Sequence, residues 1–228
     1  MRVLTIDTAG FKEIVGIVDG GEIVAATESP AGRGQQRTLL AAVDELLRAA
    51  GAAIDDVDGI AVSIGPGRFS GLRVGLATAK GLARGGRPVW GVSTLEALAQ
   101  TVADDPAAGR WICAATDARR GEVYAALFER AADGSIERVT DDVALPPDEA
   151  AGWAIERTGG ECVLFAGSGA EAYRDRIESA AGEAAAIAAR PSVERMVGAL
   201  ARLTERMATS DSTDVRTLEP VYIRGAVG

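Results

Sequence analysis

The chain of 228 residues contains no histidine and only two cysteines, Cys113 and Cys162. Without histidine, a Ser-His-Asp triad, a Cys-His dyad and a histidine-ligated zinc site are all excluded. The two cysteines are too far apart in the sequence to form a metal-thiolate motif. Both lie in apolar, strand-like runs, so we expect two buried free thiols in a reducing cytoplasm.

Aromatic residues are also scarce, at 4% of the chain, but hydrophobic residues make up 47%. Ala, Val, Leu and Ile can therefore build a sizeable core. No apolar run reaches the length that crosses a membrane. The N-terminal segment carries an acid, Asp7, and no cleavage-site pattern, so we expect no signal peptide and a cytoplasmic protein.

The chain also has no excess of basic residues. The 24 Lys and Arg residues face 33 Asp and Glu residues, and the formal net charge is −9. Phosphate contacts supply most of the affinity of proteins for nucleic acids. We therefore expect a nucleic acid to be a poor direct ligand for this chain alone.

The order of the expected strands and helices occurs twice along the chain. Gly20-Gly21 and Asp133-Gly134 each separate two apolar runs and predict hairpins. In the first half we expect strands at 2–8, 12–19, 22–28, 59–64 and 88–91 and helices at 36–50, 70–84 and directly after Ser93. In the second half we expect strands at 111–116, 122–129, 135–140 and 162–166 and helices from Pro147, from Ser168 and over 192–208.

Three antiparallel strands followed by β-α units, repeated twice, are typical of a duplicated ribonuclease-H-like unit. The sequence thus predicts an α/β protein of the actin-like, sugar-kinase-like fold, with mixed sheets flanked by helices. A generic α/β protein is the alternative. The Pro/Gly-containing segment 104–109 suits a linker. We expect an N-terminal domain over 1–105, completed by helix 192–208, and a smaller domain over 106–191 with the tail 209–228.

Two features suggest a phosphate site. A loop with glycines at 65, 67 and 71 joins a strand to a helix, which is a typical phosphate cradle. It lacks the Gly-Lys-Ser/Thr of a Walker A loop and the spacing of a dinucleotide fingerprint, and a plain tight turn is the alternative.

The turn Asp7-Thr8-Ala9-Gly10 resembles the Asp-x-Gly turn of actin-like kinases. Because Ala9 replaces the glycine, we favour a structural role for Asp7 over a nucleotide contact by Asp7 and Thr8. Asp117 stands at the matching place in the second half, and we do not expect it to be catalytic.

Five segments, in the same order, resemble motifs of the TsaB (YeaZ) family. They are Leu4–Thr8, Gly65–Arg73, Trp90–Leu98, Thr116–Tyr124 and Leu218–Arg224. The resemblance is dense over the first hundred residues. It singles out a motif loop formed by Gly65, Pro66, Gly67, Phe69, Ser70, Gly71 and Arg73. It implies a bacterial subunit of the machinery that makes threonylcarbamoyladenosine in tRNA.

The resemblance also implies partners. The catalytic relative TsaD grips a metal ion with histidines that this chain does not have. We therefore expect a subunit with no catalytic or metal-ligating residues and no cofactor of its own, which binds and supports TsaD. A TsaE-like ATPase would complete the assembly, ATP and a metal ion would belong to partner subunits, and tRNA would be reached only through the complex.

Three other functions stay open. The first is a small-molecule kinase or ATP-binding protein of the actin-like superfamily. The second is a peptidase, which the absence of histidine disfavours. The third is a structural homodimer with another regulatory task.

Two expected helices, 36–50 and 70–84, carry wide apolar stripes, most of which must cover the sheet. The resemblance implies that these helices dock against the equivalent pair of TsaD as a helical bundle. The expected interface residues are Leu39, Leu40, Val43, Leu47, Leu72, Val74 and Leu76. We expect the same surface to form a homodimer when the chain is isolated.

Overall fold

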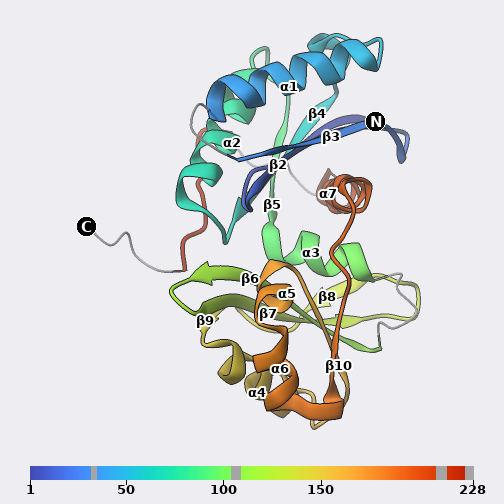
Figure 1. Ribbon diagram of the computed structural model, residues 1–228. Helices are drawn as coiled ribbons and strands as arrows, with labels where there is room; N and C mark the ends of the chain where they lie inside the picture. The colour runs from blue at the N-terminus through green and yellow to red at the C-terminus, as the bar shows by residue number, and fades with distance from the viewer. Residues whose placement is uncertain (32–34, 104–108, 209–214, 224–228) are drawn as a thin grey trace. The chain divides into compact units, whose positions relative to one another are not determined.

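The structure, a computed structural model, describes residues 1–31, 35–103, 109–208 and 215–223, without the side chains of 35–38. The chain divides into two units. The first comprises Met1–Thr94 and Ser192–Val221, and the second comprises Leu95–Pro191 and Tyr222–Gly228. Each unit is a mixed sheet with helices packed against it, as Figure 1 shows.

The sheet of the first unit has the strand order β3-β2-β1-β4-β5. Its strands are β1 (Arg2–Asp7), β2 (Lys12–Asp19), β3 (Glu22–Pro30), β4 (Gly59–Gly65) and β5 (Val89–Ser93). The first three strands pair antiparallel, and β4 and β5 pair parallel to β1 and to each other. Gly20 and Gly21 form the β2–β3 turn with φ of 56° and 88°, which is why glycine is needed there.

Helices cover both faces of this sheet. The helices α1 (Gln35–Ala49) and α2 (Phe69–Leu82) pack on one face, and α7 (Val193–Ala208) packs on the other (Figure 1). Leu4 and Ile6 of β1 are fully buried on the α1–α2 side, where each contributes about 1.5–3 kcal/mol. On the opposite face, Val18 packs against Val197 and Ala201 of α7.

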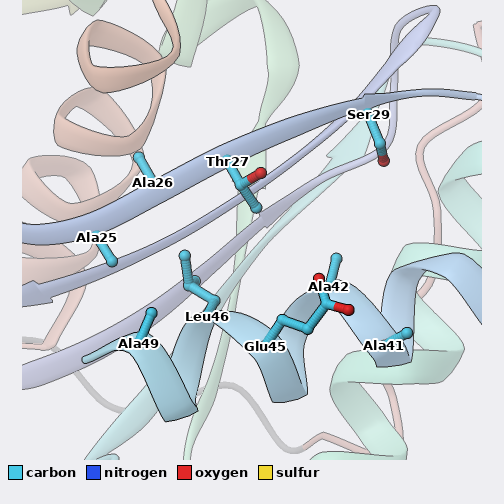
Figure 2. A pocket seen from close by; sticks show the side chains of 9 residues that line it. All are labelled: Ala25, Ala26, Thr27, Ser29, Ala41, Ala42, Glu45, Leu46 and Ala49. Carbon is cyan, nitrogen blue, oxygen red and sulfur yellow. The ribbon is translucent and has the colours of Figure 1, made fainter. Parts of the chain in front are cut away.

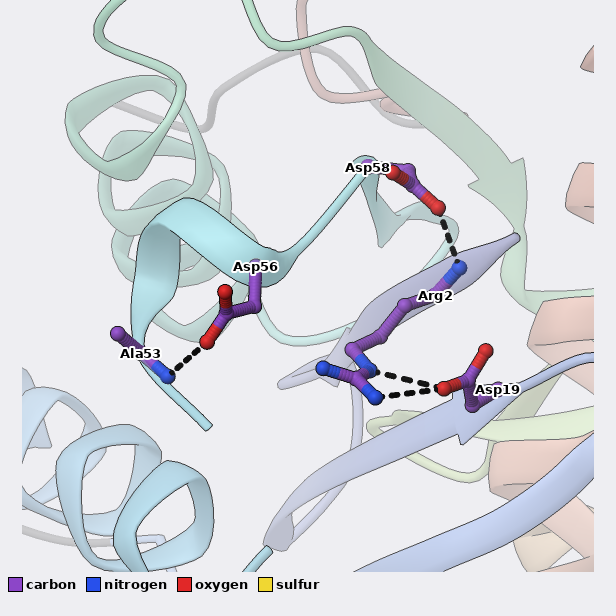
Figure 3. A network of polar contacts seen from close by, with 5 residues as sticks. All are labelled: Arg2, Asp19, Ala53, Asp56 and Asp58. Atoms are coloured by element: carbon purple, nitrogen blue, oxygen red, sulfur yellow. Dashed lines mark hydrogen bonds and ion pairs between the residues drawn. The ribbon is translucent and has the colours of Figure 1, made fainter. Parts of the chain in front are cut away.

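Polar contacts fix the start of β1 (Figure 3). The guanidinium of Arg2 donates from Nε and Nη2 to Asp19 Oδ2, at 3.0 and 2.7 Å. The backbone N–H of Arg2 donates to Asp58 Oδ2 at 2.7 Å, and Ala53 N donates to Asp56 Oδ2 at 2.8 Å. The contacts of Arg2 join the central strand β1 to β2 and to the segment before β4, and the Ala53–Asp56 contact closes the turn in that segment.

The second unit repeats the antiparallel-then-parallel layout. Its strands are β6 (Trp111–Arg119), β7 (Glu122–Arg130), β8 (Ile136–Arg138), β9 (Val143–Leu145), β10 (Val163–Ala166) and β11 (Ala185–Ile187). The order is β11-β10-β6-β7-β8, and β9 also pairs with β7. Its helices are α3 (Thr94–Val102), α4 (Pro147–Arg157), α5 (Ser168–Ala172) and α6 (Arg174–Ala181). Alanines of α4 and Ile177 of α6 pack against Phe165 and Leu127 of this sheet.

Three details differ from the sequence analysis. The division between the units falls at Thr94, whereas we expected it near residue 105, because Leu98 of α3 packs beside Gly167 of the second unit. The segment around Leu218 groups with the first unit, since this side chain is part of that unit's core. The prediction of a buried thiol is confirmed for Cys113 and wrong for Cys162, which lies just before β10 and is exposed.

Burial changes the acidity of the Cys113 thiol. Burial raises the pKa of the Cys113 thiol to about 12, so it stays protonated at neutral pH.

Within the described part of the chain, no helix is both long enough and apolar enough to cross a membrane.

Candidate functional site

The motif loop packs directly on the β1–β2 turn. Thr8 Oγ1 donates to the carbonyl oxygen of Gly71 at 2.8 Å, and Arg68 N donates to the carbonyl oxygen of Ala9 at 2.8 Å. A Cβ atom on Gly71 would lie 2.1 Å from the carbonyl oxygen of Thr8, and one on Gly67 would lie 2.7 Å from that of Ala9. The glycines are therefore required by backbone-to-backbone contact inside the first unit.

This contact bears on the phosphate-cradle hypothesis. The side of the Thr8-Ala9 turn that meets the loop is covered by the backbone of Gly67 and Gly71. Gly75, one helical turn further on, lies against Thr8, because a Cβ there would be 2.2 Å from Thr8 Oγ1. A nucleotide contact by Asp7 or Thr8 stays a prediction, but the glycine spacing is explained without a ligand.

The carboxyl of Asp7 lies beneath this turn and is only 6% exposed. Its Oδ1 accepts a hydrogen bond from Ala9 N at 3.0 Å. Burial raises the pKa of this carboxyl, and the hydrogen bond from Ala9 N opposes the rise. Asp7 thus orders its own turn through a backbone amide, as short polar side chains at strand ends commonly do.

The C-terminal segment closes the other side of the loop. Val221 N donates to the carbonyl oxygen of Ile64 at 2.7 Å, and Gly65, with φ of 124°, lies so close that a Cβ would be 2.5 Å from Val221 O. Leu218 is 7% exposed and fills the space above Gly91, where a Cβ would lie 2.6 Å from Leu218 Cδ1. Sequence reasoning missed this pairing. The motif at Leu218–Arg224 was the available signal, but a single sequence does not show which strand end it meets.

The outer rim of the loop carries aromatic and basic side chains. Phe69 is 44% exposed, and the guanidinium of Arg73 lies 3.8 Å from the centroid of its ring. Arg68 lies 5.7 Å from the ring of Phe11 and donates to the carbonyl oxygen of Gly10 at 3.2 Å. Exposed aromatic rings and arginines are the groups that protein interfaces favour. Of the remaining loop residues, Pro66 is buried and Ser70 is exposed.

The expected interface residues differ greatly in exposure. Leu39, Val43, Leu47, Leu72 and Leu76 are buried, and Val74 is half-buried against the core. Leu40 alone among the seven is exposed, at 50%. Whether these residues contact a partner stays a prediction, but the buried ones already stabilise the isolated unit.

A groove lies between α1 and the C-terminal end of α2. Its volume is about 470 Å3. Its walls are formed by Leu40, Val43, Asp44, Leu47, Arg48, Ala52, Ala53, Ile54 and Leu82. Leu40 therefore stands at the edge of an apolar depression that side chains of another helix can enter.

The second unit has a turn that corresponds to the Asp7 turn. Asp117 Oδ1 accepts from Arg119 N at 2.8 Å and from the Tyr173 hydroxyl at 3.3 Å. Burial first, and then the Asp117 charge, raise the pKa of the Tyr173 phenol. Among the residues that the structure describes, no group of three His, Cys, Asp or Glu side chains is placed to hold a metal ion.

The duplicated mixed sheets define the class of protein, the actin-like, sugar-kinase-like fold. A ROK hexokinase from Thermus thermophilus shares this fold with a TM-score of 0.54 and 14% identity, covering 90% of this chain and 99% of the hexokinase. At that identity the similarity concerns the fold alone. YeaZ from Pseudomonas aeruginosa superimposes with a TM-score of 0.76 and 28% identity, covering 97% of this chain and 99% of YeaZ.

Sequence comparison identifies the family. The tRNA threonylcarbamoyladenosine biosynthesis protein TsaB of Escherichia coli is 32% identical over 234 residues, covering 100% of this chain and 96% of the relative. The model of the TsaD family, described as tRNA N6-adenosine threonylcarbamoyltransferase, matches residues 29–227. The chain therefore belongs to the TsaB (YeaZ) family, whose members are related to TsaD. The predicted family and fold class are both confirmed.

Proposed function

We propose that this protein acts in the formation of N6-threonylcarbamoyladenosine in tRNA. The observation that carries the proposal is the identity to Escherichia coli TsaB, which extends over the whole chain and nearly all of that relative. Because the similarity covers both units, it is not limited to one shared domain. Because the proposed reaction modifies tRNA, we expect the protein to act in the cytoplasm.

Within this pathway the chain serves as a non-catalytic subunit that binds and supports a TsaD-like catalytic subunit. Two features support this role. The chain has no histidine to hold a catalytic metal or to act as a general base, and the Asp7 carboxyl is engaged by its own turn. ATP and a metal ion then belong to partner subunits, including a TsaE-like ATPase. With a net charge of −9, the chain reaches tRNA through the complex.

The surface for TsaD is the exposed part of α1 and α2. Leu40 projects at the edge of the α1–α2 groove, which Ile54 and Leu82 also line. At the other end of α2, Phe69 exposes its ring. A helical partner gains affinity by placing apolar side chains in such a groove. In the absence of the partner, the same surface pairs two copies of this chain.

Reconstitution with a TsaD-like subunit, a TsaE-like subunit, threonylcarbamoyl-adenylate and tRNA tests the role. We expect modified tRNA only when TsaD is present, and full activity only when this chain is present as well. Modification of tRNA by this chain alone would show that it is an enzyme. Unchanged activity of TsaD without this chain would contradict the supporting role.

Charge substitutions at two neighbouring leucines, Leu39 and Leu40, test the interface. Leu40→Glu places a charge on the exposed surface, so the protein stays folded, while desolvation of the charge weakens TsaD binding by roughly a hundredfold or more. Leu39→Glu places the charge in the core and unfolds the first unit. Circular dichroism measures whether each variant is folded, and co-purification measures its binding to TsaD. A folded Leu40→Glu variant that still binds TsaD as tightly as the parent places the interface elsewhere.

Homodimer formation is read by sedimentation of the isolated protein. We expect the parent to dimerise and Leu40→Glu to shift toward monomer. Calorimetry with Mg-ATP tests the kinase alternative, because a sugar-kinase-like enzyme needs clear binding of the nucleotide by the chain alone. No contact in the described residues favours that alternative over the proposed role.

A further inference from the structure

Strand β3 forms one edge of the five-stranded sheet, next to β2. Ile17 pairs with Ala25 and Val18 pairs with Ile23, so Val24 is an extra residue that forms a bulge near the start of the strand. Pro30 ends the strand. Between these two interruptions lies a regular stretch, Ala25–Ser29, which pairs with β2 on one side. In the described ranges, no strand pairs with its other side.

A groove runs along this open stretch (Figure 2). Its volume is about 500 Å3. It is lined by Ala25, Ala26, Thr27, Ser29, Ala41, Ala42, Glu45, Leu46 and Ala49. Figure 2 shows Ala25, Thr27 and Ser29 pointing toward α1, as the alternation of a strand requires. The groove thus lies between the α1-facing side of the edge strand and the helix.

The helix wall of the groove is made of small side chains around one charge. Ala41, Glu45 and Ala49 follow one another at intervals of four residues, so they share one face of α1, and all three are exposed. Of the described residues that line the groove, Glu45 alone is charged. The alanines leave room for side chains of moderate size on either side of a carboxylate.

An open strand edge beside a groove is the geometry of strand addition, in which main-chain hydrogen bonds give affinity and alternate side chains enter pockets. We propose that Ala25–Ser29 and this groove, here called the β3 groove, bind an extended segment of a partner protein as a sixth strand. The segment places small aliphatic side chains over Ala41 and Ala49 and a lysine or arginine against Glu45.

The charge of the groove and of the chain favours a basic partner segment over a second copy of the chain. Two β3 edges in antiparallel pairing bring like-charged residues together, because Glu22 precedes the stretch, Glu28 lies within it, and the chain as a whole carries −9. Lys12 already pairs with Glu28 and is not available to a partner copy. A basic extended segment matches Glu45, whereas a second copy does not. This inference does not depend on the proposed function.

A capped hexapeptide in which Val, Lys and Val alternate with Thr is the probe, and the same peptide with Glu in place of Lys is its control. Titration into isotope-labelled protein is followed by NMR. We expect the lysine peptide to bind with a dissociation constant on the order of 100 μM. It should shift the amide signals of Ala25–Ser29 and of the α1 face that carries Glu45, and the glutamate peptide should bind at least fivefold more weakly.

Matched variants test the shape and the charge of the helix wall separately. Ala41→Phe fills the groove and should weaken the lysine peptide at least tenfold, whereas Ala180→Phe, at an exposed helical alanine of the second unit, should leave binding unchanged. Glu45→Lys should reverse the preference to the glutamate peptide. Asp44→Lys, the same change at a neighbouring carboxylate outside the β3 groove, should preserve it.

The possible outcomes separate clearly. Preference for the lysine peptide that Glu45→Lys reverses, with shifts confined to the β3 groove, supports the proposal. The absence of shifts at about 1 mM lysine peptide overturns it, and so does binding that maps outside the groove. If the β3 signals move with protein concentration alone, the edge pairs two copies of the chain and the proposal is wrong.

Discussion

The two strand-end turns of the molecule share a local device and differ in burial. Asp7 and Asp117 each accept a hydrogen bond from the backbone N–H two residues further on, Ala9 in the first unit and Arg119 in the second. Asp7 is buried under the motif loop, whereas Asp117 is partly open and also meets the hydroxyl of Tyr173. An aspartate at the end of the first strand of each unit therefore organises a turn, whatever surrounds it.

In each unit, a helix from later in the chain (α2 or α5) approaches this turn through a glycine. A Cβ on Gly71 would lie 2.1 Å from Thr8 O, and one on Gly169 would lie 2.8 Å from the carbonyl carbon of Thr116. The contact between helix and turn is closer in the first unit. There the C-terminal segment also contacts the start of the loop, because Val221 N donates to the carbonyl oxygen of Ile64. The comparison shows that tight packing explains glycines at a place where a ligand cradle was one expectation.

Substitution of these glycines should have the largest effect. Gly71→Ala pushes a methyl group into backbone, which cannot move without displacing β1, so we expect a loss of about 2–4 kcal/mol in the free energy of unfolding. Gly169→Ala should cost less, about 1–3 kcal/mol, because the overlap is smaller. Urea denaturation measures both. Equal or negligible losses would contradict the ranking of the two contacts.

A second comparison concerns pH. Burial raises the folded-state pKa of Asp7, so the folded protein binds a proton that the unfolded chain releases. The contribution of this group to stability is full below its unfolded pKa and is lost as pH rises through the folded value. Compared with Asp7→Asn, the parent should therefore gain stability as pH falls from 7 to 4. Urea denaturation at several pH values measures the difference, and a constant difference would contradict the prediction.

Asp148 in the second unit should show the opposite slope. Its own backbone N–H, and then the guanidinium of Arg176, lower the pKa of this carboxyl. The stabilisation is present above the unfolded pKa and is lost as pH falls through the folded value. Asp148→Asn should therefore be less stable than the parent at pH 7 and approach it in acid. If both variants show slopes of the same sign, the burial difference between the two carboxyls is not what controls them.

The smallest effects are expected at helical glycines that touch nothing. Apart from the backbone of their own helix and their chain neighbours, nothing lies within 4 Å of where a Cβ would stand at Gly81 in α2 or Gly152 in α4. Gly81→Ala and Gly152→Ala should each raise the free energy of unfolding by about 0.5–1 kcal/mol, because alanine favours the helix. Thermal unfolding followed by circular dichroism measures the gain. A loss at Gly81 would mean that packing, and not helix propensity, also controls this end of α2.

Much of the fold follows from local pattern. The apolar run in Lys12–Asp19 predicted β2 with the bounds that the structure has, and the apolar spacing predicted α1 and α2 within two residues at each end. The strands β9 and β11 were missed. Ala185–Ile187 lies in an alanine-rich run that favours helix, and it becomes a strand only by pairing with β10.

The candidate site was harder to predict from the sequence. The motif loop was identified, but its glycines face Thr8 and Ala9 from a distant part of the chain, and no local rule pairs them. The apolar stripe of α1 showed a helix with one covered side, yet it did not separate buried Leu39 from exposed Leu40. These neighbours point in different directions, and only the position of the sheet decides which one meets solvent.

The pairing of Val221 with Ile64 has a consequence for the order of events during synthesis. The first unit receives α7 and Leu218 only after the whole second unit has been translated. A ribosome-bound chain that ends within the second unit therefore carries a sheet whose α7 side is bare. Since domains generally fold as they emerge from the ribosome, the second unit is expected to reach its native state first. The N-terminal unit is completed only when α7 and the C-terminal segment emerge, and until then we expect its bare apolar face to bind chaperones.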